Sequence, residues 1–183
     1  MKKKLNLYNN IVVRFTGFGG QGIVLAGYIL GKSAIFDGKN SLQTQSYGSE
    51  ARGGTCKSDV FISDKEIFEF ETDELDILVS MSQTAYNRYI PLLKKNGILI
   101  VDRDLVKVVS EKITCYRVDA VDTAEKVIGR KIMANIVMLG FLTGKTKITT
   151  YESMKKSIIE SVPEVTVEKN LKAFDEGYKK SIV

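Results

Sequence analysis

Apolar residues fall into short blocks along the chain, and the spacing within each block indicates whether it forms a strand or a helix. Residues 11–15 are a mostly β-branched run that ends at a cluster of glycines, which predicts a β-strand. Residues 21–36 have the length and apolar density of a helix largely buried against a sheet. Gly27 and Gly31 lie one turn apart on this helix, and each costs about 1 kcal/mol of helix propensity relative to alanine. We therefore expect these glycines to allow another backbone to pack closely.

The next part of the chain alternates extended runs with turn-forming residues. Strands are predicted over residues 40–45 and 55–62, on either side of a glycine-rich segment. The polar residues from Ser63 to Glu66 have the composition of a hairpin turn, which would lead into a further strand over residues 67–70. An antiparallel ribbon here would replace the helix of a simple β-α-β unit, so the sheet is expected to be mixed.

The rest of the chain has the alternation of strands and helices that is typical of α/β proteins. Further strands are predicted over residues 77–79, 98–101 (entered through Asn96 and Gly97) and 113–118, and helices over residues 83–93, 123–128, 132–143 and 167–180. Thr149 and Glu152 have the spacing of a capping box, which predicts a helix that runs to residue 161, before Pro163. The expected fold is a Rossmann-like three-layer α/β/α arrangement with a mixed, mostly parallel sheet and a helical C-terminal region, in a single domain over residues 1–183.

Composition limits the partners and the location that this domain can have. No apolar run reaches the roughly 18 to 20 residues of a membrane span, and no signal-peptide pattern follows the basic N-terminus. We expect a soluble, cytoplasmic protein that does not enter a membrane. The net charge of +5 comes from scattered lysines, with one cluster at Lys2 to Lys4, and the basic residues are not interleaved with a stacking aromatic face. Nucleic acid is therefore not an expected partner.

The chain has few residues that bind metals or transfer protons. Its two cysteines, Cys56 and Cys115, fit no iron–sulfur or zinc spacing, and it contains no histidine. No metal site is expected, and any redox cluster must lie on another chain. We interpret both cysteines as small apolar residues of a reducing compartment. Without histidine, the commonest general base is absent, so we assign no catalytic residue.

The first glycine-rich loop has the spacing of a dinucleotide-binding motif. Gly17, Gly19 and Gly22 form G-x-G-x-x-G directly after a predicted strand and before a predicted helix. Glycines at these positions let a backbone approach a pyrophosphate, and the start of the helix favours an anion. Three interpretations are open: binding of NAD(P), a tight turn that only permits close packing, or contact with another phosphate-bearing group or with the backbone of another subunit.

The NAD(P) interpretation needs an acidic residue at the end of the second strand, where it would hold a ribose hydroxyl. That strand end reads Gln43-Thr44-Gln45-Ser46. Asp37 comes too early, at the end of the predicted helix, and Glu50 lies inside the next loop. The spacing of the glycines alone is therefore a weak indication of a nucleotide.

A second loop makes the pattern more specific. Residues 17–22 read Gly-Phe-Gly-Gly-Gln-Gly, residues 46–54 read Ser-Tyr-Gly-Ser-Glu-Ala-Arg-Gly-Gly, and residues 135–140 are an asparagine-led apolar helix. These motifs resemble the gamma subunit, or gamma domain, of the pyruvate and 2-oxoglutarate ferredoxin oxidoreductases, which have G-x-G-G-Q-G and S-Y-G-P-E-A-R-G-G. Ser49 stands where proline is usual, which relaxes one turn. The resemblance extends from about residue 11 to residue 174.

The resemblance implies a complex that decarboxylates a 2-oxoacid with thiamine diphosphate, passes electrons through iron–sulfur clusters to ferredoxin or flavodoxin, and transfers the acyl group to coenzyme A. This chain lacks the Gly-Asp-Gly signature of a thiamine diphosphate site and the cysteines of a cluster. Its implied partners are subunits of the alpha, beta and delta types. Its implied role is to complete the complex, with a share in a coenzyme A or substrate channel. We favour 2-oxoglutarate as the oxoacid, with pyruvate, branched-chain oxoacids and indolepyruvate left open.

The two loops also supply the candidate cofactor-binding residues. These are Gly19, Gly20, Gln21, Gly22, Ser46, Tyr47, Arg52 and Gly53. The guanidinium of Arg52 offers paired donors to a phosphate, a carboxylate or a neighbouring subunit, or pairs with Glu50. Tyr47 is suited to an interface, and the amide of Gln21 either orients a loop or partner or makes ordinary first-turn hydrogen bonds. Two other functions stay open: a free-standing NAD(P)-binding domain, and an assembly module without a ligand.

Overall fold

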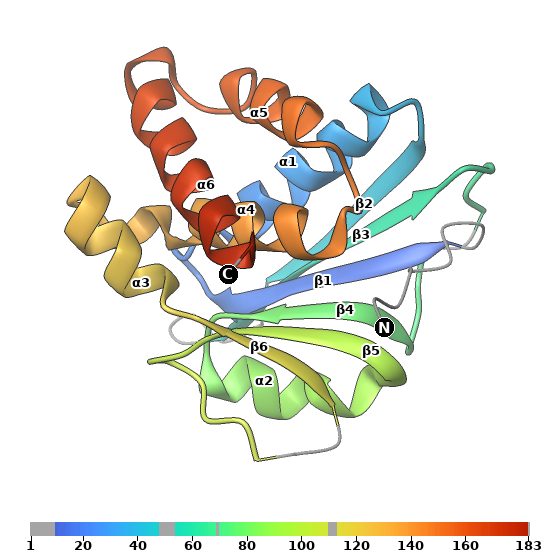
Figure 1. Cartoon of the computed structure of the whole chain (residues 1–183). Coiled ribbons are helices and arrows are strands. Elements are labelled where there is room, and N and C mark those ends of the chain that lie inside the picture. Colours follow the sequence, from blue (N-terminus) through green and yellow to red (C-terminus); the bar gives the residue numbers. More distant parts are fainter. Residues whose placement is uncertain (1–9, 48–53, 69, 110–112, 183) are drawn as a thin grey trace.

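The structure is a computed structural model that describes residues 10–47, 54–68, 70–109 and 113–182. Its centre is a six-stranded sheet with the order β2-β3-β1-β4-β5-β6 (Figure 1). The strands are β1 (Ile11–Phe18), β2 (Asn40–Tyr47), β3 (Thr55–Ser63), β4 (Leu75–Ser80), β5 (Leu93–Asp102) and β6 (Thr114–Val118). The pairs β1/β4, β4/β5 and β5/β6 are parallel, whereas β3 is antiparallel to both β1 and β2. The predicted mixed, mostly parallel sheet is confirmed.

Helices cover both faces of this sheet, and the C-terminal region is helical as predicted. The helices are α1 (Ile23–Phe36), α2 (Gln83–Tyr89), α3 (Ala120–Thr123), α4 (Ala134–Thr146), α5 (Tyr151–Ile159) and α6 (Val167–Ile182). Short turns of other helical types are η1 (Ile90–Leu92), η2 (Ala124–Ile128), η3 (Lys131–Met133) and η4 (Glu164–Thr166). In Figure 1, α1, α4, α5 and α6 lie over one face of the sheet, and α2 lies under the other. The predicted three-layer α/β/α arrangement is therefore confirmed.

Alternating side chains of the central strand β1 supply two hydrophobic cores. Val13 and Phe15 pack with Leu30 of α1 in the larger core. Val12 points to the opposite face, where it packs with Tyr86 of α2 in the smaller core. Because successive side chains of a strand point to opposite faces, a strand buried on both sides reads as a nearly continuous apolar run. This explains the strength of the signal over residues 11–15.

One polar pair interrupts the smaller core. Arg14 and Asp59 are direct cross-strand neighbours of β1 and β3, and Arg14 Nη2 donates a hydrogen bond to Asp59 Oδ2 at 2.7 Å. Their side chains are 3% and 4% exposed. The guanidinium carbon of Arg14 also lies 4.8 Å from the ring centroid of Tyr89. A buried charge requires such partners, because removing one of them leaves the other uncompensated.

The predicted strand over residues 67–70 is wrong. Residues 66–68 and 70 are not part of a strand, and Phe68 and Phe70 are exposed. The antiparallel pairing of consecutive strands is instead formed by β2 and β3. Both edges of β3 are already paired, one with β2 and one with β1, so no edge of β3 remains for another strand.

Several other boundaries differ from prediction, and two of these differences change a predicted local feature. Thr150, not Thr149, caps α5: its Oγ1 accepts a hydrogen bond from the backbone N–H of Ser153 at 3.2 Å. The predicted pairing of Thr149 with Glu152 is therefore displaced by one residue. Strand β5 begins at Leu93, so Asn96 and Gly97 lie within it; the pairing register of β4 and β5 shifts in this region.

Two glycines of α1 do lie close to the sheet, but the atoms that approach them belong to side chains and not to the backbone that was predicted. A Cβ atom on Gly27 would lie 2.9 Å from Gln43 Nε2, and one on Gly31 would lie 3.0 Å from Ser41 Oγ. Both contacts are made with β2, the edge strand of the sheet. The glycines thus bring α1 close to the strands that carry the second glycine-rich loop.

Candidate functional site

The strand register brings the two glycine-rich loops to the same end of the sheet. Gly17 of β1 is the direct neighbour of Cys56 on β3, and Cys56 is in turn the neighbour of Tyr47 on β2. The first loop therefore leaves β1 at the end of the sheet where β2 ends and β3 begins. Two motifs that are about 30 residues apart in the sequence become adjacent through the antiparallel pairing of β3 with both of its neighbours.

The backbone of the first loop explains its glycines. Gly20 has φ of 90° and Gly22 has φ of 70°, in the left-handed region that favours glycine. At Gly17, a Cβ atom would lie 2.9 Å from Ile23 Cδ1. Gly22 is also the N-cap of α1, and no side chain caps this end of the helix. The loop thus exposes backbone N–H groups at the positive end of a helix.

Gln21 holds this loop against the neighbouring strand. Its Oε1 accepts a hydrogen bond from the backbone N–H of Phe18 at 2.7 Å, and its Nε2 donates one to the carbonyl oxygen of Met81 at 2.9 Å. Met81 directly follows β4, which pairs with β1. Both ends of the amide are used within the chain, so this geometry describes a residue that orients the loop.

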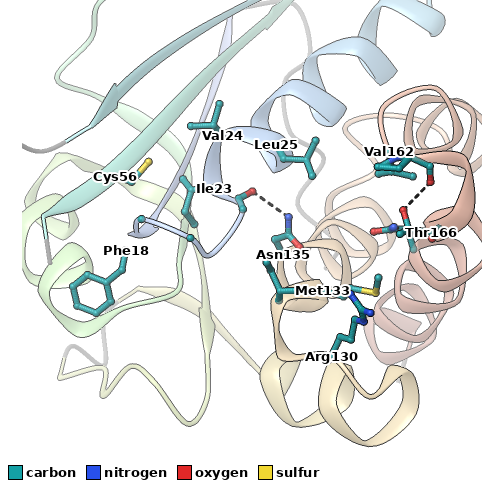
Figure 2. Close-up of a pocket in the computed structure, with 16 residues that line it drawn as sticks. Phe18, Ile23, Val24, Leu25, Cys56, Arg130, Met133, Asn135, Val162 and Thr166 are labelled. Carbon is teal, nitrogen blue, oxygen red and sulfur yellow. Dashed lines mark hydrogen bonds between the residues drawn. The ribbon is translucent and has the colours of Figure 1, made fainter. Parts of the chain in front are cut away.

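Asn135 brings the third sequence motif to the same place. Its Nδ2 donates a hydrogen bond to the carbonyl oxygen of Gly22 at 3.1 Å, and its side chain is almost fully buried. A Cβ atom on Gly22 would lie 2.9 Å from Asn135 Cγ. The start of α4 and the start of α1 are thus fitted to each other, with a dashed line marking this hydrogen bond in Figure 2.

These elements enclose a cleft of about 430 Å³ (Figure 2). Its lining is mainly apolar and comes from the first loop, the starts of α1, β3 and α4, and the segment before α6. The lining residues are Phe18, Gly19, Gly20, Gly22, Ile23, Val24, Leu25, Cys56, Arg130, Ile132, Met133, Asn135, Val162, Pro163, Thr166 and Asn170. Among these described residues, Arg130 is the one charged side chain, and no acid lines the cleft.

The candidate residues from the sequence are distributed unevenly around this cleft. Gly19, Gly20 and Gly22 line it. Gln21 does not line it but holds the loop in place through its hydrogen bond to the carbonyl oxygen of Met81. Ser46 is exposed on the edge strand β2 and does not line the cleft. Tyr47 ends β2, and nothing further is described of its side chain. Arg52 and Gly53 lie outside the described residues.

Sequence reasoning missed the groups that the C-terminal half contributes. Arg130 and Met133 line the cleft because they precede α4, which begins next to Gly22. The signal that pointed there was the asparagine-led motif, whose first residue contacts the first loop. Cys56 also lines the cleft, and burial raises the pKa of its thiol. The thiol is therefore neutral at physiological pH and is not an activated nucleophile.

The chemistry of the cleft favours binding over catalysis. Backbone N–H groups, a helix start and one guanidinium attract an anion, while the apolar walls accommodate a hydrophobic group. Asp37 is the acid that precedes β2 in the sequence. It lies at the far end of α1, where it accepts hydrogen bonds from Thr150 and Ser153. It is not placed to hold a ribose beside the first loop. Within the described ranges, no three His, Cys, Asp or Glu side chains are grouped as a metal site.

Among the helices that the structure describes, none combines the length and the apolar character of a transmembrane segment.

Known proteins share both the sequence and the fold. Residues 12–180 match the family described as "Pyruvate ferredoxin/flavodoxin oxidoreductase". The chain is 50% identical over 171 residues to the 2-oxoglutarate synthase subunit KorC of Methanocaldococcus jannaschii, covering 91% of each chain. It is 33% identical over 180 residues to the pyruvate synthase subunit PorC of the same organism, covering 94% of this chain and 97% of that subunit.

Two solved structures extend this similarity. The gamma subunit of a keto/oxoacid ferredoxin oxidoreductase from Geobacter sulfurreducens superposes with a TM-score of 0.84 at 41% identity, covering 94% of this chain and 98% of that one. A 2-oxoglutarate:ferredoxin oxidoreductase from Magnetococcus marinus gives a TM-score of 0.83 at 21% identity, covering 94% of this chain and 31% of that one, which shows a shared fold. The resemblance read from the loops is confirmed: this chain belongs to the pyruvate ferredoxin/flavodoxin oxidoreductase family and is a gamma-type subunit.

Proposed function

We propose that this chain is the gamma subunit of a 2-oxoglutarate:ferredoxin oxidoreductase, a complex that converts 2-oxoglutarate to an acyl-CoA and CO2. The observation that carries the choice of oxoacid is the order of similarity. Two subunits named for 2-oxoglutarate synthase are 50% and 45% identical to this chain. A pyruvate synthase subunit is 33% identical, and a ketoisovalerate oxidoreductase subunit is 28% identical.

The division of labour in this proposal follows from the residues that the chain contains. Two cysteines and no histidine do not provide the ligand set of an iron–sulfur cluster. We assign the clusters and thiamine diphosphate to alpha-, beta- and delta-type partner subunits, which pass electrons to ferredoxin or flavodoxin. The gamma chain then contributes to assembly.

A second part of the proposal concerns coenzyme A. The cleft beside Gly19, Gly20 and Gly22 combines anion-binding features with apolar walls, and coenzyme A combines phosphates with a long, less polar arm. Arg130 would contact a phosphate, and the N–H groups at the start of α1 would contact another. When bound in the complex, coenzyme A supplies the thiol that accepts the acyl group. The family resemblance and the chemistry of the lining residues support this assignment.

Copurification tests the proposed function. The full-length chain, expressed with its native partner genes, is expected to copurify with a thiamine diphosphate-binding chain and a ferredoxin-like chain. Calorimetric titration of the resulting complex with coenzyme A should show binding that Arg130→Ala weakens about 10-fold, whereas Lys126→Ala, which removes a nearby surface cation, leaves it unchanged. Micromolar binding of NAD(H) or NADP(H) by the chain alone, without partner chains, would instead support a free-standing nucleotide-binding domain.

A further inference from the structure

The connection between β3 and β4 differs in charge from the rest of the protein. Residues 64–74, called the acidic segment below, contain six of the 22 acidic residues of the chain and one lysine. The whole chain nevertheless has a net charge of +5. Negative charge is therefore concentrated on one connection of an otherwise basic protein.

The acidic segment also presents the two most exposed phenylalanines of the described chain. Phe68 is 80% exposed and Phe70 is 55% exposed. Ile67, by contrast, packs against the smaller hydrophobic core. Burial of a phenylalanine ring is favourable because it removes apolar surface from water, so two exposed rings on one short segment can contribute strongly to association.

Hydrogen bonds lie at both ends of the acidic segment. Near its start, the N–H of Lys65 donates to Ser63 Oγ at 3.0 Å. Near its end, the N–H of Glu74 donates to Thr72 Oγ1 at 3.0 Å. Directly after it, Asp76 Oδ2 accepts a hydrogen bond from the N–H of Val12 at 2.9 Å. The first bond thus ties the start of the segment to β3, the second closes a local turn within the segment, and the third ties the start of β4 to β1.

The described acids of the acidic segment have no ion-pair partner among the described residues. Within residues 10–47, 54–68, 70–109 and 113–182, none of its described acids forms an ion pair; these acids are Asp64, Glu66, Glu71, Asp73 and Glu74. By contrast, the neighbouring Asp76 has an ion-pair partner: its Oδ1 lies 2.9 Å from Nζ of Lys94. These acids flank the two exposed rings in the sequence, so the acidic segment combines negative charge with exposed apolar surface.

From these observations we infer that the acidic segment is a docking surface for another subunit of the complex, one that presents basic side chains around apolar pockets. Phe68 and Phe70 are the anchors, and the acids steer a positively charged partner and fix its orientation. This inference rests on the proposed function, because it requires a complex. A symmetric pair of this chain joined through the segment is disfavoured, because the two acidic segments would repel each other.

The position of the acidic segment separates it from the cleft. It joins the end of β3 to the start of β4, and β3 runs antiparallel to β1. The acidic segment therefore lies beside the start of β1, whereas the glycine-rich loop follows the end of β1. In Figure 1 this connection runs at the right-hand side, at the opposite end of the strands from the start of α1. A partner docked there leaves the cleft open to a ligand.

The test measures affinity for copurified partner subunits in three variants of the full-length chain. The double variant Phe68→Ser/Phe70→Ser removes the anchors, and Glu71→Lys/Asp73→Lys reverses two charges. Val109→Ser, at a residue that is 88% exposed elsewhere on the surface, is the matched control. The first variant should weaken binding at least about 10-fold with an unchanged melting temperature. The second should weaken binding at low salt and reduce its salt dependence, and the control should bind like the wild type.

Each other outcome overturns the inference in a distinguishable way. If the wild-type chain binds the partner subunits and both double variants bind equally well, the acidic segment is not the interface, although the proposed function stands. If the wild-type chain does not bind these subunits, the proposed function itself fails. If Phe68→Ser/Phe70→Ser lowers the melting temperature of the isolated chain only while residues 2–9 are present, the chain's own lysine-rich N-terminus is the occupant. Self-association of the wild type that this variant abolishes would identify a second copy.

Discussion

Asn135 Nδ2 donates a hydrogen bond to the carbonyl oxygen of Gly22 at 3.1 Å, and so joins two motifs that are 113 residues apart in the sequence. The first motif ends the glycine-rich loop, and the second begins α4. Asn135 is buried, whereas Gly22 is half-buried at the cleft, and the carbonyl of Gly22 also accepts a hydrogen bond from the N–H of Ala26 at 2.9 Å. The contact fixes one wall of the cleft relative to the other.

Replacing Asn135 should therefore destabilise the protein and widen the cleft. Asn135→Ala is expected to lower the free energy of unfolding by about 0.5–1.5 kcal/mol, since it removes one hydrogen bond while the carbonyl of Gly22 keeps the N–H of Ala26 as a donor. Denaturant unfolding measures the effect. Asn87→Ala, which removes an exposed asparagine from α2, is the control and should change the stability by less than about 0.5 kcal/mol. Equal effects of the two substitutions would show that the contact contributes little.

Gly22 and Gly38 provide a matched pair for the glycine-rich loop. Both have positive φ, 70° and 75°, but a Cβ atom on Gly22 would collide with Asn135, whereas one on Gly38 would meet nothing within 4 Å. Gly38→Ala should cost only the backbone strain of about 1–2 kcal/mol. Gly22→Ala should cost clearly more, and the double variant Gly22→Ala/Asn135→Ala should cost less than the sum of its single changes. Additive effects, measured by thermal unfolding, would contradict the predicted collision.

Gln21 should control the shape of the loop through its two hydrogen bonds. Gln21→Glu keeps an oxygen that can accept from the N–H of Phe18 but removes the donor to the carbonyl of Met81. We expect a loss of about 1–3 kcal/mol of stability and weaker binding of coenzyme A by the complex. Gln45→Glu, at an exposed position of the edge strand β2, is the comparison. Unchanged stability in Gln21→Glu would mean that the loop does not depend on this bridge.

The acid sensitivity of the contact between α1 and α5 should depend on Asp37. Burial opposes its ionisation, but hydrogen bonds from Ser153 and Thr150 outweigh burial and lower the pKa of this carboxyl below 3.8. A lowered folded-state pKa means that the stabilisation is present above the unfolded-state pKa of about 3.9 and is lost as pH falls through the folded-state value.

Asp37→Asn should consequently reduce the free energy of unfolding at pH 7 and flatten its decrease below about pH 4. Urea unfolding at several pH values between neutrality and the acid range measures both effects. Asp104→Asn, at a side chain that is 53% exposed, should leave the decrease of the free energy of unfolding at low pH unchanged. If the free energy of unfolding of Asp37→Asn falls as steeply below about pH 4 as that of the wild type, other carboxyls cause this pH dependence.

Much of this fold could be predicted because its strands are buried on both faces. Val12 and Val13 serve different cores, so the apolar pattern around them is dense and unambiguous. The predicted strand over residues 67–70 failed because Phe68 and Phe70 have the composition of a strand, but no edge of β3 is free to pair with them. Strand composition is local, whereas pairing depends on neighbours that are distant in the sequence.

The site was predictable only in part for a related reason. The glycine spacing located one wall of the cleft, and the left-handed conformations of Gly20 and Gly22 explain why those residues are glycine. The contribution of Arg130 depends on how α4 meets α1, which is tertiary information. The assignment of residues 1–183 to a single domain, and the role of Arg52, stay predictions.

The most direct measurement is the reduction of ferredoxin by the reconstituted complex, with 2-oxoglutarate as electron donor, in the presence and absence of this chain. We predict that reduction requires this chain, 2-oxoglutarate and coenzyme A, and that pyruvate supports a lower rate. The copurified partner subunits without this chain are the control and should be inactive until it is added. Full 2-oxoglutarate-dependent reduction by the partner subunits alone, or a complex that prefers pyruvate, would contradict the proposed function.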